Sequence, residues 1–190
     1  MRRIYVNCGS SPGARPEYRA AARTLGQTLV RNNLEIVYGG AHVGLMGALA
    51  DAALDAGGAV IGVIPKGLRK LAHERLSELR VVDSMHERKA TMFDLADGVI
   101  ALPGGIGTIE EVLEVITWAQ LGLHAKPCGL LNVCGYYDRL LEFLDHAVDQ
   151  QFVMPEHRQM ILVHDDPDAL LEQFWGFRPP PPVPKWQNLE

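Results

Sequence analysis

The segment 103–111 holds the residues whose types and spacing are best suited to chemistry. It reads Pro-Gly-Gly-Ile-Gly-Thr-Ile-Glu-Glu and lies between an apolar run at 99–102 and a segment with apolar residues at helical spacing. Glycines let the backbone approach a ligand closely, and Thr108 with the free N–H groups of a new helix can face a phosphate. Glu110 and Glu111 are expected in the first helical turn, beside that anion. Because a carboxylate next to a phosphate is electrostatically unfavourable, its presence there indicates a function. We therefore expect a functional phosphate loop; a tight turn whose glycines serve only packing is the alternative.

A second group of charged residues follows Ser84. Ser84 with Glu87 three positions later is typical of a capping box, which starts a helix that carries Arg88. If this helix begins at the same sheet edge as the glycine loop, Arg88 points into the pocket as a fixed cation with a bidentate fork. An exposed helix charge is the alternative, since Glu87 and Lys89 are its neighbours.

The elements that must position these groups alternate along the chain. Strands are expected at 4–8, 34–38, 59–64, 80–82, 99–102, 127–133 and 160–163, and helical segments follow most of them. The connection 66–78 is expected to be a charged, irregular rim or lid. This alternation predicts a single-domain, doubly wound, Rossmann-like α/β fold over residues 1–177, with a mostly parallel sheet and helices on both faces. Residues 178–190 are expected to form an extended proline-rich tail.

Ligands of doubly wound folds lie outside the carboxyl ends of the strands. Two further loops are expected at that edge. The turn at 9–13 contains Ser10, which either cradles a nucleotide or serves only the turn, and the loop at 39–47 contains Gly40. Both loops therefore belong to the same expected crevice as the central glycine loop.

Composition narrows the class of protein further. The chain has 190 residues, 47% of them hydrophobic and 22% charged, and a formal net charge of −5. The acidic balance argues against a general nucleic-acid or anionic-membrane surface, and no apolar run reaches membrane-spanning length. Cys8, Cys128 and Cys134 lie in or beside apolar runs, which indicates buried, reduced thiols and a cytoplasmic location. Histidines and cysteines lack paired ligand spacing, so neither a metal nor another cofactor is expected.

Two motifs resemble those of the LOG (Lonely Guy) family. The segment Pro103–Glu111 resembles the family's PGGxGTxxE signature, and Met85–Lys89 resembles its second motif. The similarity extends from Ile4 to about Val163. It implies cytokinin riboside 5'-monophosphate phosphoribohydrolase activity, in which an N6-modified or plain adenosine monophosphate is cleaved into free base and ribose 5-phosphate. Such proteins were long labelled lysine decarboxylases, but no lysine of this chain is placed by the motifs as a pyridoxal partner.

The resemblance also implies roles for individual residues. Arg88 and Glu111 are the expected catalytic residues, and the phosphate falls to the glycine loop. From both lines of reasoning, the residues expected to bind the substrate are Ser10, Gly40, Lys89, Gly104, Gly105, Ile106, Gly107, Thr108, Glu110 and Thr117. The sequence departs from the family pattern at two positions: many relatives have an acidic residue where this chain has Lys70, and a tyrosine where it has Ile106. Both departures bear on recognition of the base.

The chemistry of such a cleavage assigns a task to the carboxylate. An N-ribosidic bond breaks through an oxocarbenium-like sugar. A nearby carboxylate either stabilises that positive charge or activates the water that attacks on the face opposite the leaving base. Glu111 fits this task, and Arg88 either neutralises the phosphate or orients Glu111, lowering the pKa of the carboxyl. A non-catalytic nucleotide sensor is the main alternative, and a carrier or DNA-processing protein of related fold is another.

The helix at 111–121 predicts an assembly. Its apolar residues occupy more than one stripe, so one face covers the sheet and a second face is expected to meet another subunit in a two-fold dimer. Residues of the partner, from the rim at 66–75, would then complete the crevice. Cover of that second face by the chain's own C-terminal helix and proline tail is the alternative.

Overall fold

The computed structural model describes residues 1–180 of the chain. The predicted proline-rich tail falls on residues 178–190; residues 178–180 carry neither helix nor strand, and the rest lies outside the described residues. The strands are β1 (Arg3–Asn7), β2 (Glu35–Tyr38), β3 (Val60–Pro65), β4 (Glu78–Val82), β5 (Gly98–Ala101), β6 (Cys128–Leu131) and β7 (Ile161–His164). The helices are α1 (Pro16–Arg31), α2 (Gly44–Asp55), α3 (Met85–Leu95), α4 (Ile106–Gln120), α5 (Asp138–Asp149), α6 (Pro155–Gln159) and α7 (Pro167–Gly176).

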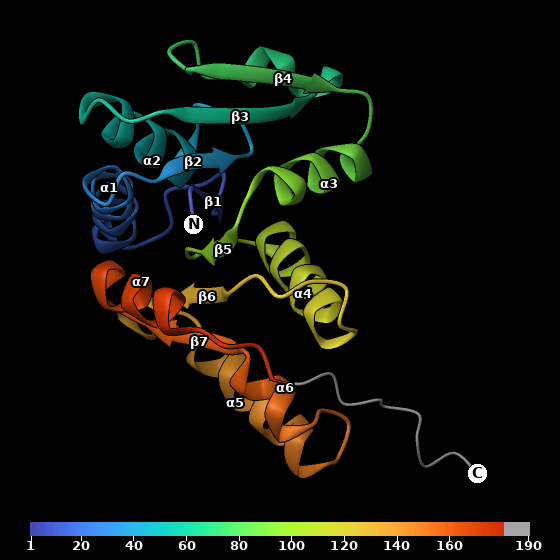
Figure 1. Cartoon of the computed structure of the whole chain (residues 1–190). Coiled ribbons are helices and arrows are strands. Elements are labelled where there is room, and N and C mark those ends of the chain that lie inside the picture. The colour runs from blue at the N-terminus through green and yellow to red at the C-terminus, as the bar shows by residue number, and fades with distance from the viewer. Residues whose placement is uncertain (181–190) are drawn as a thin grey trace.

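The strands form one parallel sheet in the order β4-β3-β2-β1-β5-β6-β7 (Figure 1). The chain starts at the central strand β1, moves outward to β4, and then crosses back to place β5 on the other side of β1. Ile4 accordingly pairs with Ile36 of β2 on one side and with Gly98 of β5 on the other. This reversal between β1 and β5 is the topological switch point at which doubly wound folds bind ligands. The predicted fold class is confirmed.

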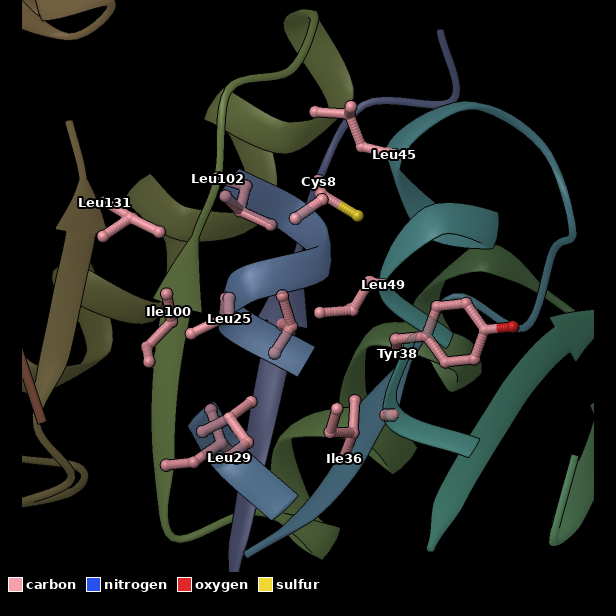
Figure 2. Packing of buried hydrophobic residues seen from close by; sticks show 14 of the residues in the cluster. Cys8, Leu25, Leu29, Ile36, Tyr38, Leu45, Leu49, Ile100, Leu102 and Leu131 are labelled. Atoms are coloured by element: carbon pink, nitrogen blue, oxygen red, sulfur yellow. The ribbon is translucent and has the colours of Figure 1, made fainter. Parts of the chain in front are cut away.

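Helices cover both faces of the sheet. On one face α1, α2 and α7 bury apolar side chains such as Leu25, Leu49 and Phe174 against the strands. Figure 2 shows Leu25 of α1 beside Ile100 of β5, and Leu49 of α2 on the side of Tyr38. On the other face Met92 of α3 and Val115 of α4 pack against the central strands, and α5 packs with α4 over β6 and β7. Strands buried on both faces explain the continuous apolar runs in the sequence.

Three local features differ from the sequence-based expectation. The first turn of α4 holds no acidic residue, because Gly105 is the N-cap and Glu110 and Glu111 therefore fall in the second turn. The rim is less irregular than expected, since Lys66–Leu71 form a 3₁₀ helix. The helix α6 was not predicted, because five residues are too few to show helical periodicity.

Cys134 corrects one expectation about the thiols. Cys8 and Cys128 are buried free cysteines, but Cys134 is exposed. It sits in the short 3₁₀ turn Val133–Gly135 with a φ of 52°. The turn follows the end of β6 and carries the chain toward α5, so the cysteine leaves the apolar layer to which its neighbours belong. Among the described residues, no helix is both long and apolar enough to cross a membrane.

Candidate active site

A cavity of about 300 Å³ opens at the carboxyl ends of β1, β2 and β5, where the strand order reverses. It is bounded by the loops after these strands and by α3 and α4. Its lining residues are Val6, Asn7, Cys8, Ser10, Gly39, Met46, Arg88, Gly105, Ile106, Gly107, Thr108 and Glu111. The structure therefore brings together seven of the twelve residues predicted for the site, including both predicted catalytic residues.

The glycine loop presents bare backbone to this cavity. Gly105 is the extended N-cap residue of α4, and its carbonyl accepts the helical bond from the N–H of Ile109 at 3.1 Å. A Cβ atom built on Gly105 or Gly107 meets no protein atom within 4 Å. The missing side chains thus leave space open to the cavity, rather than space needed for packing. Unpaired N–H groups at a helix N-terminus beside such a space suit a phosphate.

Thr108 packs against the glycine loop. Its side chain is buried, and its hydroxyl lies against Gly104, where a Cβ atom would collide with it. Gly104 itself lines a neighbouring cavity of about 250 Å³ together with Ser10, Tyr18 and Tyr136. The hydroxyl of Tyr136 donates to the carbonyl of Gly104. The loop is therefore held from both sides, which keeps its N–H groups in place.

Arg88 is fixed by backbone carbonyls. Its Nε donates to the carbonyl of Val63 at 3.1 Å, and Nη2 donates to the carbonyl of Gly39 at 3.3 Å. A Cβ atom on Gly39 would overlap the guanidinium, so glycine is required there. The predicted capping box starts the helix that carries Arg88: the N–H of Glu87 donates to the hydroxyl of Ser84 at 3.1 Å. A rigid cation at the cavity wall is the result.

Glu111 faces this cation from α4. Its Oε1 lies 3.8 Å from Nη1 of Arg88, and the side chain is 13% exposed. The hydroxyl of the buried Tyr5 donates to its Oε2 at 2.9 Å. Burial raises the pKa of Glu111, and this effect exceeds the lowering by Arg88 and by Tyr5. The expectation of a lowered pKa is thus wrong in sign, because sequence shows the nearby cation but not the loss of water.

Five predicted site residues do not line the cavity: Gly104, which lines the neighbouring cavity, and Gly40, Lys89, Glu110 and Thr117. Lys89 is largely buried and its Nζ lies 2.5 Å from Glu110 and 3.0 Å from Glu114, so the three form an ion-pair cluster beside the site. These carboxylates raise the pKa of Lys89. Thr117 is exposed, and its hydroxyl donates to the carbonyl of Leu113 in its own helix. Gly40 is also outside the lining.

Gly40 has a structural task instead. It adopts a φ of 77°, which favours glycine, and its carbonyl accepts a hydrogen bond from the N–H of His73 at 2.9 Å. This bond and an isolated bridge between Ala41 and Ala72 tie the rim to the loop after β2. Of the two departures from the family pattern, Ile106 lines the active cavity and is 88% exposed, whereas Lys70 lines a separate cavity of about 410 Å³.

Several residues of the site escaped the sequence reasoning. The cavity wall includes Val6, Asn7, Cys8, Gly39 and Met46, and Tyr5 lies behind it with its hydroxyl on Glu111. One signal for them existed. Side chains two apart on a strand share a face, and Asn7 is a polar residue in an apolar strand, so Tyr5 and Asn7 could have been assigned to the ligand side. Burial raises the pKa of the Cys8 thiol, which keeps it protonated and unreactive.

The donor set of the site indicates acid–base chemistry on an anionic substrate. Among the described residues, no group of three or more histidine, cysteine or acidic side chains is placed to hold a metal ion. The cavity combines backbone donors for an anion, one fixed cation and one ionisable carboxylate. This arrangement can bind a phosphate ester and stabilise positive charge that develops one helical turn away from the phosphate.

A family model described as "possible lysine decarboxylase" matches residues 46–174. The chain is 53% identical over 183 residues to the probable cytokinin riboside 5'-monophosphate phosphoribohydrolase LOGL5 of Oryza sativa subsp. japonica, covering 95% of this chain and 74% of the relative. It is 51% identical over 181 residues to cytokinin riboside 5'-monophosphate phosphoribohydrolase LOG7 of Arabidopsis thaliana, covering 94% and 83%.

Solved structures share the fold at lower identity. The molybdenum cofactor binding protein of Rippkaea orientalis superimposes with a TM-score of 0.72 at 23% identity, covering 93% of this chain and 96% of that one. A likeness at this identity concerns the arrangement of strands and helices and not the ligand. The curated relatives at about half identity carry the information on chemistry.

Proposed function

This chain belongs to the LOG family, and we propose that it hydrolyses the N-glycosidic bond of adenosine 5'-monophosphates, N6-modified or plain. Water adds its oxygen to C1' of the ribose, the bond from C1' to the base nitrogen breaks, and the base leaves with the electron pair and a proton. The products are free base and ribose 5-phosphate. The observation that carries the proposal is the pairing of Glu111 and Arg88 in the cavity that the phosphate loop also lines.

The substrate phosphate binds at the start of α4. Gly105, Gly107 and Thr108 hold it through backbone N–H groups and a hydroxyl, and Ser10 contributes from the loop after β1. Glu111 follows about one helical turn later, about 6 Å further along the helix axis from Gly107, which is of the order of the distance from the 5'-phosphate to C1' in a nucleotide. C1' of the sugar therefore comes to the carboxylate when the phosphate is bound.

Glu111 acts in its ionised form. As the C1'–N bond lengthens, positive charge develops on the sugar, and the carboxylate stabilises it or takes a proton from the attacking water. Arg88 balances the carboxylate and the substrate phosphate, and Tyr5 holds Oε2 in place. The raised pKa of Glu111 makes the carboxylate a better base than an exposed glutamate.

The name of the matching family model refers to another reaction. Decarboxylation of lysine by pyridoxal chemistry requires a lysine that forms a Schiff base. Among the described residues that line the cavity there is no lysine. Lys89, which the second motif places nearby, is engaged by Glu110 and Glu114. Hydrolysis of a nucleotide is the reaction that this set of side chains supports.

The proposal includes a two-fold dimer through α4. Leu121 and Leu123, just after the end of this helix, are 55% and 70% exposed. The ring of Trp118 packs edge-on against Phe93 of α3, with 5.1 Å between the ring centroids. The chain's own α7 does not cover them, since it packs on the opposite face of the sheet. An exposed apolar surface beside an active site is a common subunit interface.

Residues 1–177 form the nucleotide-binding unit of this proposal. Because all three cysteines are free thiols, a reducing, cytoplasmic compartment suits the chain. The test of the function is incubation with AMP and with isopentenyl-adenosine monophosphate, followed by separation of the products. Release of base with ribose 5-phosphate supports hydrolysis, whereas binding without turnover would support the sensor.

A further inference from the structure

The side chain of Asn7 is a buried amide without an ordinary hydrogen-bond partner. Asn7 ends β1 and is 2% exposed. Neither Nδ2 nor Oδ1 has a partner within hydrogen-bond geometry, although the amide lies close enough to the Tyr5 hydroxyl to act on it as a hydrogen-bonding group. Its backbone is satisfied, because its carbonyl accepts from the N–H of Leu102 at 2.8 Å. A buried amide without well-formed hydrogen bonds costs stability, and a role in binding or catalysis is one of the reasons why native proteins retain such a group.

The amide lies in the wall of the active-site cavity. Asn7 and Tyr5 are two apart on β1 and face the same side of the sheet, toward α3 and α4. The amide is near enough to the Tyr5 hydroxyl to lower the pKa of that phenol, although burial raises it more. Tyr5 in turn holds Glu111. Asn7 thus lies two residues nearer the carboxyl end of β1 than Tyr5, which positions the catalytic carboxylate.

This place corresponds to the sugar of a bound nucleotide. The phosphate occupies the start of α4, and the breaking bond lies at Glu111, so the ribose spans the interval between them. A primary amide offers one acceptor and a donor pair, which matches the two neighbouring hydroxyl groups of ribose. A hydrogen bond to the 2'-hydroxyl also strengthens as charge develops at C1'.

We propose that Asn7 is the ribose-recognition residue of this enzyme, with Oδ1 accepting from the 2'-hydroxyl and Nδ2 donating to the 3'-hydroxyl oxygen. The inference rests on the proposed hydrolysis of nucleotides. It predicts that the protein distinguishes ribonucleotides from 2'-deoxyribonucleotides through one buried side chain.

The test is a cycle of two proteins and two substrates. We compare kcat/KM of the wild type and of Asn7→Leu, which keeps the branched shape and the number of side-chain heavy atoms, for AMP and for 2'-deoxy-AMP. Taking the ratio of the two substrates within each protein makes the difference in their intrinsic reactivity cancel between proteins. The wild-type preference for AMP should exceed that of Asn7→Leu by about ten- to a hundred-fold, the effect of hydrogen bonds to a buried site.

A matched control separates recognition from folding. Asn132 also carries a side-chain amide, but its Nδ2 donates to Asp138 at 2.7 Å and its Oδ1 accepts from the N–H of Tyr137 at 2.7 Å. Asn132→Leu should lower the melting temperature and leave the ratio of the two substrates unchanged. Asn7→Leu should melt at or above the wild-type temperature, because it removes an unpaired buried amide.

The remaining outcomes overturn the inference. Equal losses on AMP and 2'-deoxy-AMP in Asn7→Leu, or no loss on either, would remove Asn7 from the sugar. Loss of discrimination between AMP and purine riboside 5'-monophosphate, with the sugar preference intact, would place the amide at the base. If the wild type hydrolyses no nucleotide, calorimetry with ribose 5-phosphate and 2-deoxyribose 5-phosphate still decides the question. If the wild type binds ribose 5-phosphate more tightly than 2-deoxyribose 5-phosphate and Asn7→Leu does not, the role of Asn7 in ribose recognition is supported even though the proposed hydrolysis is not.

Discussion

The hydroxyl of Tyr5 donates a hydrogen bond of 2.9 Å to Oε2 of Glu111, joining residues 106 positions apart in the sequence. Tyr5 is buried in the central strand, and Glu111 stands on α4 beside the phosphate loop. The bond lowers the pKa of the carboxyl and partly offsets its burial. It therefore fixes both the direction and the charge state of the group that we place at the reacting carbon.

Replacing Tyr5 by phenylalanine tests this relationship. The Tyr5→Phe variant keeps the ring and loses the hydrogen bond, so the pKa of Glu111 should rise further. Because the ionised carboxylate is the active form, the acid limb of the kcat/KM profile should move to higher pH, and kcat near neutrality should fall. A pH profile from 4 to 9 measures this. An acid limb that stays at the wild-type pH would show that Glu111 does not govern it.

Removing the charge of Glu111 should nearly abolish turnover. We expect Glu111→Gln to lower kcat by about 10²- to 10⁴-fold, the scale for an electrostatic or acid–base group. Binding of AMP, measured by calorimetry, should persist, because the phosphate loop is untouched. The matched control is Glu110→Gln: Glu110 pairs with Lys89 outside the cavity, so its loss should change kcat by only a few-fold. The reverse pattern would move catalysis to Glu110.

A single methyl group at Gly107 tests the phosphate loop. Gly107→Ala should raise stability by up to about 1 kcal/mol, since alanine favours a helix and its Cβ meets no protein atom within 4 Å. The same methyl group stands where the phosphate must approach, so KM for AMP should rise. Thermal melting and steady-state kinetics measure the two effects.

Adenosine provides the complementary control for the loop. It lacks the phosphate and should be a poor substrate of the wild type, because remote binding energy supports the transition state. If Gly107→Ala leaves KM for AMP unchanged, or if adenosine matches AMP in kcat/KM, the phosphate does not bind at this loop.

The dimer has a prediction of its own. At micromolar concentration the wild type should sediment as a dimer of the 20.9 kDa chain. Leu121→Asp with Leu123→Asp should shift it toward monomer, since charge would enter the apolar end of α4. Phe152→Asp, at a still more exposed apolar residue elsewhere, is the control and should leave the dimer intact. A wild-type monomer with full activity would end both the dimer and the shared site.

Local sequence patterns were enough to predict the strands, the glycine loop and the start of the helix that carries Arg88, whereas the catalytic role of Arg88 beside Glu111 came from the family resemblance. Each of the local predictions depends on spacing along a short segment, such as apolar runs or the capping box at Ser84. The place of α4 relative to α3 followed from the rule that parallel strands end at one edge.

What escaped prediction depends on contacts between distant segments. Three features arise only when segments distant in the sequence come together. They are the hydrogen bond from Tyr5 to Glu111, the hydrogen bond from Arg88 to the carbonyl of Gly39, and the burial that raises the pKa of Glu111. Thr117 shows the converse error. Its membership of the motif region suggested the site, yet its position on α4 turns it to solvent, where it bonds to Leu113.

The central claim is that this chain breaks the bond between base and ribose 5-phosphate, and product analysis over a panel of nucleotides tests it most directly. The protein is incubated with AMP, isopentenyl-adenosine monophosphate, GMP, CMP and UMP, and base and sugar phosphate are separated and quantified. We predict equal amounts of free base and ribose 5-phosphate from at least one adenosine monophosphate, and none from the Glu111→Gln variant. Intact nucleotide across the whole panel, with AMP still bound by the protein, would contradict the claim.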